Sequence, residues 1–526
     1  MKKLALLLSL LLILLAGVYL GTAYYFGLRA EKVMAERAEI LSGSLKMTVV
    51  KRDYQRNWLS SNETLTLRLS APFLEKGKNQ LPAQLRSIFD EQLTLTSKIQ
   101  HGPWLGTLFG LAKVDTKLAL SAEQQKIVKQ FFGDNEPLQI VDLINFSGSG
   151  SLKATIPAFE YQELSGIKIS WGGLNATNNY TAHYASYDSE LNAPKLNVKL
   201  ADLGFAEFHN INYKSRTERS EPINTGNSTL SLQHFSLHWD KSTDYKIRLN
   251  DIVNLLADLQ IGSFINPTVE VPPTEIELTN FKFYTSSNLK GEFVDSQGKF
   301  SFDKLNYGQD VYGPLNIDIE AKHLDAKSLA IVKQKLASMM KAKDDSSEFR
   351  EQILAIARNE AAPLFLNNPK VDLNVFSLKL PSGMLNMKGK FELNNLKQED
   401  LNDIDGILAK TNADVHFKVP VAAVEYFAQN QVRNIFKTVQ SDDESVEEIR
   451  NTVNLMVNNF INNMVKQGYL ELNQDILSGN IKIQNGAFTL NNQSMTSAHN
   501  DEDDDFFDDM NEDANIANEN TSEMKI

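Results

Sequence analysis

The chain has no cysteine among its 526 residues. Disulfide bridges, thiolate metal sites and thiol catalysis are therefore excluded. No linker rich in Pro, Gly and Ser divides residues 45–495, and no internal repeat of fixed period is present. Because linkers of that composition usually separate domains, their absence favours one continuous body over several modules.

Positive charge is not in excess. Lys and Arg number 53 against 66 Asp and Glu, a net charge of −13. A chain of this sign repels nucleic-acid phosphates, so we expect no nucleic-acid partner. Residues 501–526 carry −10 of the net charge. We expect a solvated, disordered tail over 496–526; loose calcium binding or docking of a partner through Phe506 and Phe507 are alternatives.

Charge is missing from Leu4 to Leu28. These residues predict a membrane-spanning helix, because at about 1.5 Å per residue they exceed a hydrocarbon core of about 30 Å. Lys2 and Lys3 favour a cytoplasmic N-terminus. We therefore expect a transmembrane anchor over 1–28, a membrane-proximal helix or linker over 29–44, and the rest of the chain on the far side of the membrane.

A cleaved signal peptide is the competing interpretation, with a small-residue site at Gly21-Thr22-Ala23. A secretory apolar region usually has about 7–15 residues, which favours the uncleaved anchor. Gly17 and Gly21 form a G-x-x-x-G motif, a close-packing face for two membrane helices. A homodimer through this face is a hypothesis; the alternative is that glycine is simply common in membrane helices.

The body shows alternation with period two, which is typical of strands with one apolar and one wet face. Val415, Phe417 and Val419, for example, alternate with His416 and Lys418. Some strands change parity partway, as β-bulges do, and bulges bend a sheet. The pattern predicts an α+β, β-rich fold with long curved antiparallel sheets over 45–495. Helices are predicted mainly in the C-terminal half, near 326–342, 346–360, 420–438 and 442–467.

The sequence lacks the local motifs that are typical of enzyme active sites. The sequence has no G-x-S-x-G nucleophile elbow, no phosphate-binding loop and no G-x-G-x-x-G opening a helix. His234 and His238 share one strand face without a third ligand, which favours an exposed polar surface over a metal site. We assign no catalytic, cofactor-binding or metal-binding residue and expect no enzyme. A cell-wall or polysaccharide hydrolase, which needs no local motif, is a weaker alternative.

Several short motifs in one order make the chain resemble the YdgA-like family of bacterial envelope proteins, which is catalogued as a domain of unknown function. The first lies around Tyr54 and Arg56, where Asn57 and Leu59 depart from the family's pattern. The other matching positions are His101, Gly102 and Pro103, then Tyr312, Gly313 and Pro314, then Asn485 and Gly486. The resemblance ends near residue 495. It implies an inner-membrane-anchored periplasmic protein and supplies no reaction.

Together these observations predict a non-enzymatic bacterial inner-membrane protein whose bulk is periplasmic. Our leading hypothesis is that a curved sheet binds lipid or another apolar ligand in an apolar groove, because acyl chains need no polar motif. An ordinary packed core is equally compatible with the alternation. The alternative function is a structural or interaction protein that assembles or regulates envelope partners.

Overall fold

The structure is a computed structural model that describes residues 2–42, 47–69, 92–239, 274–308, 310–341, 355–356, 359–402, 404–436 and 443–495. The acidic tail over 496–526 and most of the helix predicted near 346–360 lie outside these residues.

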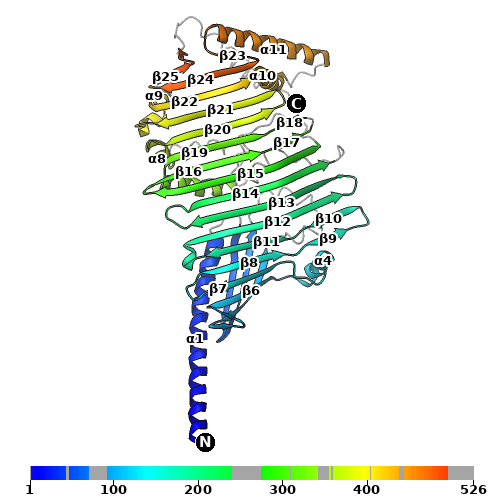
Figure 1. The fold of residues 1–526 in the computed structure, drawn as a ribbon, viewed down its shortest axis with the longest axis vertical. Coiled ribbons are helices and arrows are strands. Elements are labelled where there is room, and N and C mark those ends of the chain that lie inside the picture. Colours follow the sequence, from blue (N-terminus) through cyan, green and yellow to red (C-terminus); the bar gives the residue numbers. More distant parts are fainter. Residues whose placement is uncertain are drawn as a thin grey trace, which may run out of the picture.

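One helix, α1 (Lys2–Ser42, 41 residues), forms the N-terminus. It is long and apolar enough to cross a membrane. The predicted anchor and the predicted membrane-proximal helix are continuous, without a break near residue 28. Figure 1 shows the free N-terminal part of α1 projecting from one end of the molecule, opposite to α11 (Asp443–Lys466).

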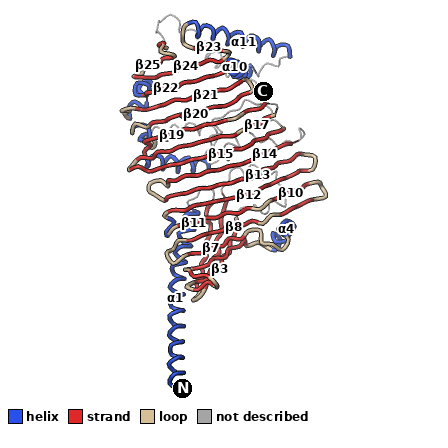
Figure 2. The backbone as a smooth tube through the Cα atoms, viewed as in Figure 1, coloured by secondary structure: helices blue, strands red, loops and turns tan. Residues whose placement is uncertain are grey.

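The described strands form one 24-stranded sheet and a separate two-stranded hairpin. Every described pairing is antiparallel, and most strands pair with strands close in sequence, so the chain runs as a meander along the molecule (Figures 1 and 2). The β-rich α+β prediction is confirmed. The strands β1 (Met47–Arg56), β2 (Ser60–Leu69) and β3 (Leu93–His101) stand upright beside α1, whereas those from β12 (Ser186–Leu200) onward run across the long axis, which shows how strongly the sheet twists.

The first half of the large sheet contains β1 (Met47–Arg56), β2 (Ser60–Leu69), β3 (Leu93–His101), β6 (Ala112–Leu118), β7 (Gln139–Ile144), β8 (Gly150–Ile156), β9 (Phe159–Gln162), β10 (Ile167–Trp171), β11 (Leu174–Tyr180), β12 (Ser186–Leu200), β13 (Gly204–Glu218) and β14 (Thr225–Trp239). The second half contains β15 (Glu275–Lys290), β16 (Phe293–Phe302), β17 (Lys304–Tyr307), β18 (Asp310–Tyr312), β19 (Leu315–Asp325), β20 (Lys370–Leu380), β21 (Gly383–Leu393), β22 (Thr411–Pro420), β23 (Glu471–Asn473), β24 (Ile476–Gln484), β25 (Ala487–Leu490) and β26 (Gln493–Ser494). The hairpin is β4 (Trp104–Leu105) with β5 (Leu108–Phe109).

The changes of parity in the sequence correspond to local irregularities of the strands, of register in one case and of backbone conformation in others. The pairing of β20 with β21 shifts between Leu373 and Phe376. In β15 the parity changes at Asn280, whose φ of 51° is left-handed, and β13 has the same feature at Asn210. Asparagine tolerates this conformation better than most residues, which explains its use at both positions.

The other helices are α4 (Ala122–Phe132), η1 (Ala182–Tyr184), α6 (Ala326–Lys341), α8 (Ala362–Leu366), η3 (Gln398–Asn402), α9 (Ile404–Lys410) and α10 (Val421–Phe436), besides α11. The helices α6, α10 and α11 lie at the predicted ranges near 326–342, 420–438 and 442–467. The sequence analysis missed α4, whose start is fixed by a capping box between Ser121 and Gln124.

Candidate functional site

The C-terminal half of α1 packs on one face of the sheet. A strip of mostly small residues on α1 is buried there, at the spacing that places them on one side of a helix: Ala23, Gly27, Ala30, Met34 and Ala38. The sheet contributes fully buried residues, among them Ile99, Val114 and Ile144. We call this contact between α1 and the sheet the joint.

His101 contributes to the joint against Gly27 of α1. Its side chain is only 1% exposed, and its Nε2 hydrogen bonds with the Ser61 hydroxyl over 2.9 Å. A Cβ on Gly27 would lie 2.5 Å from the imidazole, so only glycine allows α1 this close. Burial lowers the pKa of His101, which favours the neutral ring. The HGP motif thus includes a packing contact with the predicted membrane helix.

Gly102 is also fixed by a close approach. A Cβ at this position would overlap the Gly110 carbonyl oxygen, and the Gly102 amide donates to the Leu111 carbonyl over 2.7 Å. Pro103 then begins the loop that carries β4 and β5, with its carbonyl accepting from the Gly110 amide over 3.1 Å. Gly102 and Pro103 therefore form a rigid turn that starts this loop.

Tyr54 and Arg56 of the first motif meet the same helix. Arg56 pairs with Glu31 of α1 over 2.5 Å, and its guanidinium lies 5.1 Å from the centre of the Tyr24 ring. Tyr54 packs against the buried cluster beneath α1, and burial raises the pKa of its phenol. The structure thus brings the first two motifs together around α1.

A buried ionic cluster, which sequence reasoning missed, fastens α1 further along. Arg37 of α1 pairs with Asp142 of β7, whose side chain is 1% exposed. The Tyr180 hydroxyl donates to the same carboxylate over 2.9 Å, and Arg37 donates to the Tyr184 hydroxyl over 2.9 Å. Burial alone would lower the pKa of Arg37, but the adjacent Asp142 carboxylate raises it overall, so the guanidinium stays charged.

The remaining motif positions lie elsewhere in the sheet and do not meet the joint. Tyr312 ends β18, and burial raises the pKa of its hydroxyl. Gly313 has a φ of 107° and would place a Cβ 2.6 Å from the Asp303 carbonyl oxygen; Pro314 follows and leads into β19. Asn485 and Gly486 have φ of 53° and 78° in the tight turn between β24 and β25, and a two-residue type I′ turn requires positive φ at both positions.

Gly17 and Gly21 lie on the free part of α1. Nothing is within 4 Å of a Cβ built at either position, so this face is available to a second helix. The homodimer hypothesis and the orientation given by Lys2 and Lys3 remain predictions.

Beyond the joint, the same sheet face carries a continuous line of large apolar side chains. Cross-strand pairing places one such residue from each strand directly beside the next. This apolar row consists of Leu191, Tyr213, Leu230, Phe283, Phe300, Ile317, Phe376, Met387 and Phe417. With strands about 4.8 Å apart, it is roughly 40 Å long. All nine side chains are half-buried.

The apolar row shares its face with the joint. Pairing from β11 to β12 joins Ala176 to Leu191, and pairing through β8 and β7 joins Ala176 to Ile140. Ile140 lies two residues from Asp142 on the same side of β7. The face beneath α1 therefore continues without interruption into the apolar row.

The opposite face is polar. The residues that follow or precede the apolar row by one position form a second line, which Ser478 of β24 extends by one strand. This polar row consists of Asn192, Asn212, Ser231, Lys282, Ser301, Asn316, Ser377, Asn386, Lys418 and Ser478. Because successive side chains of a strand point to opposite faces, the two rows are on opposite sides of the same sheet.

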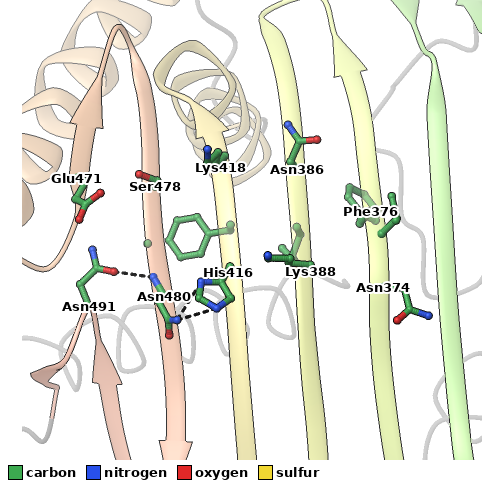
Figure 3. A pocket seen from close by; sticks show the side chains of 14 residues that line it. Asn374, Phe376, Asn386, Lys388, His416, Lys418, Glu471, Ser478, Asn480 and Asn491 are labelled. Carbon is green, nitrogen blue, oxygen red and sulfur yellow. Dashed lines mark hydrogen bonds between the residues drawn. The ribbon is translucent and has the colours of Figure 1, made fainter.

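Two shallow hollows lie over the second half of the sheet. One, of about 510 Å³, is drawn in Figure 3; its labelled side chains are mainly polar and come from β20 to β24 and from Asn491, which follows β25. The side-chain amide of Asn480 donates to His416 and Asp414, each over 3.0 Å, and its backbone N–H donates to the side-chain oxygen of Asn491 over 2.8 Å. The other hollow, of about 620 Å³, includes Ser301, Asn316 and Ser377 of the polar row.

Within the described ranges, no group of three or more His, Asp or Glu residues is placed to hold a metal ion. His234 lies on β14 beside His209, with ring centres 5.8 Å apart, and 3.5 Å from Glu207. The described residues therefore offer two candidate sites, the joint and the apolar row.

The fold and these sites define a class of protein with one long apolar N-terminal helix seated on an extended antiparallel sheet. The chain belongs to a bacterial family described as a bacterial protein of unknown function (DUF945), whose profile matches residues 1–498. This confirms the resemblance suggested by the motifs, including its end before the acidic tail. No curated protein and no solved structure matches this chain closely enough to compare.

Proposed function

We propose that this protein is a single-pass protein of the bacterial inner membrane whose sheet binds lipid acyl chains along the apolar row, on the periplasmic side. The observation that carries the proposal is the continuity of the apolar face, from the part beneath α1 to Phe417 on β22. An acyl chain that leaves the bilayer beside α1 would meet apolar side chains at every strand. Half-burial leaves part of each side chain able to contact a ligand.

Acyl binding also explains the lack of a chemical motif. Apolar ligands are recognised by contact area, with few polar groups needed. The polar row lies on the opposite face, so among the described strands this continuous line of apolar contacts belongs to one face. Lys2 and Lys3 support a cytoplasmic N-terminus, and with a single span this supports a sheet outside the cytoplasm.

Neighbouring residues on one strand give a matched test. A photoreactive phenylalanine analogue replaces Phe300 or Phe376 in one set of full-length variants, and Ser301 or Ser377 in the other. After illumination in cells, mass spectrometry of the purified chain measures covalently attached phospholipid. We expect adducts at least fivefold more abundant at positions 300 and 376. Equal labelling of both sets, or no lipid adduct at any position, would reject acyl binding.

The orientation needs its own measurement. Alkaline phosphatase fused after residue 495 is active only when exported, so activity is expected for the full-length fusion. A fusion in which Lys2 and Lys3 are retained but residues 4–28 are deleted serves as the control and is expected to be inactive. An inactive full-length fusion would overturn the periplasmic placement, and the photolabelling result would still decide whether the apolar row binds acyl chains.

A second function, docking of an envelope partner, is favoured by the helical pair α10–α11. Tyr426 and Phe427 of α10 and Leu455, Met456 and Phe460 of α11 are between 46% and 67% exposed. Asn458 donates to Glu425 over 2.6 Å, which fixes the two helices against each other. Photolabelling from position 460 tests this function, with position 461, where Ile461 is buried, as the control. A protein adduct specific to position 460 would support it.

A further inference from the structure

Three loops at the edge of the sheet nearest the free part of α1 expose large apolar residues. They are the β1–β2 turn with Trp58 and Leu59, the β4–β5 hairpin with Trp104, Leu108 and Phe109, and the β7–β8 turn with Phe146. These side chains are between 40% and 62% exposed. We call the three loops the aromatic tips. Aromatic side chains this exposed are unusual on a surface that faces only water.

The aromatic tips lie side by side. The His101 amide donates to the Leu59 carbonyl over 3.0 Å, which joins the base of the first tip to the second. The Leu111 amide donates to the Ile144 carbonyl over 2.8 Å, which joins the second to the third. In the second tip the Trp104 and Phe109 rings pack with centres 4.7 Å apart. The tips therefore form one surface.

Two of the tips contact α1 at a single level. The Trp58 ring lies 5.2 Å from Tyr24, and the Phe146 ring lies 5.3 Å from Phe26. Both α1 residues come within one helical turn of Ala23, the first α1 residue buried in the joint. In Figure 1 the tips lie at the lower edge of the sheet, where α1 leaves it.

The length of the free helix sets that level in a membrane. Between Leu4 and Thr22 about 19 residues precede the joint, and at 1.5 Å per residue they span roughly 28 Å, close to the hydrocarbon thickness of a bilayer. The aromatic tips and Tyr25, which is 55% exposed, then lie where the hydrocarbon ends and the headgroups begin. Tryptophan and tyrosine favour this layer because their rings are apolar with one polar atom.

The composition of the tips fits the same partner. The segments 57–62, 102–111 and 145–152 contain no Asp, Glu, Lys or Arg. At the other end of the same strands, the connection 119–138 between β6 and β7 carries Glu123, Lys126, Lys129, Asp134 and Glu136. Charged groups are thus absent where desolvation by lipid would be costly and present on the side away from α1.

We propose that the aromatic tips are a second membrane contact, inserted into the headgroup layer of the bilayer that α1 spans. This contact fixes the orientation of the sheet on the membrane and holds the start of its apolar face at the lipid surface. The proposal shares the membrane placement of α1 with the proposed function, but it does not depend on acyl binding along the apolar row.

The four tryptophans of the chain provide the test. One full-length variant, W171F/W239F, keeps only Trp58 and Trp104 of the tips. The other, W58F/W104F/W171F, keeps only Trp239, which is 7% exposed and distant in the sheet. Each is reconstituted in vesicles of phosphatidylethanolamine and phosphatidylglycerol that contain phospholipid brominated near the headgroup end or near the methyl end of its acyl chains. Bromine quenches tryptophan fluorescence only at short range.

We expect the tip tryptophans to lose at least half of their emission to the shallow bromines, less to the deep bromines, and Trp239 to lose almost none. Quenching of the tip tryptophans no stronger than that of Trp239 would overturn the proposal, as would failure of the chain to float with the vesicles. Strong tip quenching together with failed photolabelling at positions 300 and 376 would reject acyl binding alone.

A second variant distinguishes a membrane contact of the aromatic tips from a contact between two copies of the chain. Because the chain has no cysteine, Leu108→Cys introduces one thiol in the second tip. If the tip contacts the membrane, a water-soluble maleimide should label this thiol several-fold more slowly in the vesicle-reconstituted protein than in the protein in detergent. Formation of a disulfide-linked dimer by this variant without slower labelling would show a contact between two copies and overturn the membrane assignment.

Discussion

Two regions of one sheet face differ in how their apolar side chains are covered. Beneath α1, Ile99 and Val114 are 1% exposed and Ile144 is fully buried. Along the apolar row, Phe300 and Phe376 are only half-buried although they are larger. The same alternation of apolar and polar residues therefore produces a closed core in one region and an accessible surface in the other.

The difference comes from what lies over each region. The joint is closed by a helix with small residues at the contact, which let it approach the sheet, and by ion pairs that hold it in place. Small residues favour helix packing in this way because backbones can come close. A face that is needed for a ligand has to remain partly uncovered, and it contributes less to folding stability per side chain.

The largest expected effect comes from the buried ion pair of the joint. Arg37→Met leaves the Asp142 carboxylate buried without its cation, which should cost about 3–5 kcal/mol. Arg56→Met removes the cation of the more exposed Arg56–Glu31 pair and should cost less than about 1 kcal/mol. The urea midpoint of unfolding of each full-length variant in detergent, monitored by protease resistance, measures both losses of stability. Equal midpoints for the two variants would show that Arg37 does not hold the joint.

An identical substitution in the two regions compares them directly. Ile144→Ala in the joint should destabilise by about 2–5 kcal/mol, because a fully buried side chain leaves a cavity. Ile317→Ala in the apolar row should cost roughly 1 kcal/mol, since its side chain is already half-exposed. The same urea measurement applies. A larger loss at Ile317 would mean that the apolar row is a packed core.

Substitution of the buried glycine of α1, compared with that of a glycine on its free part, should give a smaller difference in stability. Gly27→Ala forces a methyl group against the His101 imidazole, which cannot retreat from its buried site, and should cost about 1–3 kcal/mol. Gly21→Ala meets nothing within 4 Å and should leave the stability of the joint unchanged. Thermal unfolding in detergent, monitored by protease resistance, measures both. If the two variants behave alike, then Gly27 is not needed for the close contact.

The sequence predicted the elements much better than it predicted the sites. Alternation predicted the strands, and the changes of parity predicted that some of them are irregular, as β15 is at Asn280. The apolar row was not predictable, because it depends on which residue of each strand lies opposite which residue of the next, and one residue of slip moves a side chain to the other face.

The joint was not predictable from the sequence for a similar reason. Arg37 and Asp142 are 105 positions apart, and only the fold brings them together. One signal was available in the sequence: Asp142 lies between Ile140 and Ile144 on the apolar side of its strand, and an acid there needs a partner. Tyr54 and Arg56 were selected by resemblance alone, and their contacts with α1, like that of His101, came from the structure.

The smallest effect, and the one specific to the joint, is a dependence on pH. Burial lowers the pKa of His101 in the folded chain below the unfolded value of about 6.5. Between these two values the unfolded chain binds more protons, so stability is full above about pH 6.5 and is lost as the pH falls, by at most about 1.4 kcal/mol per pH unit. Burial raises the pKa of Glu63, which acts in the opposite direction, so the raw pH profile is not informative. The difference in stability between wild type and His101→Gln is informative, because glutamine can still hydrogen bond to Ser61 but does not titrate. We expect the wild type to lose more stability than this variant between pH 7.5 and pH 5, and parallel profiles would show that His101 is not held neutral in the joint.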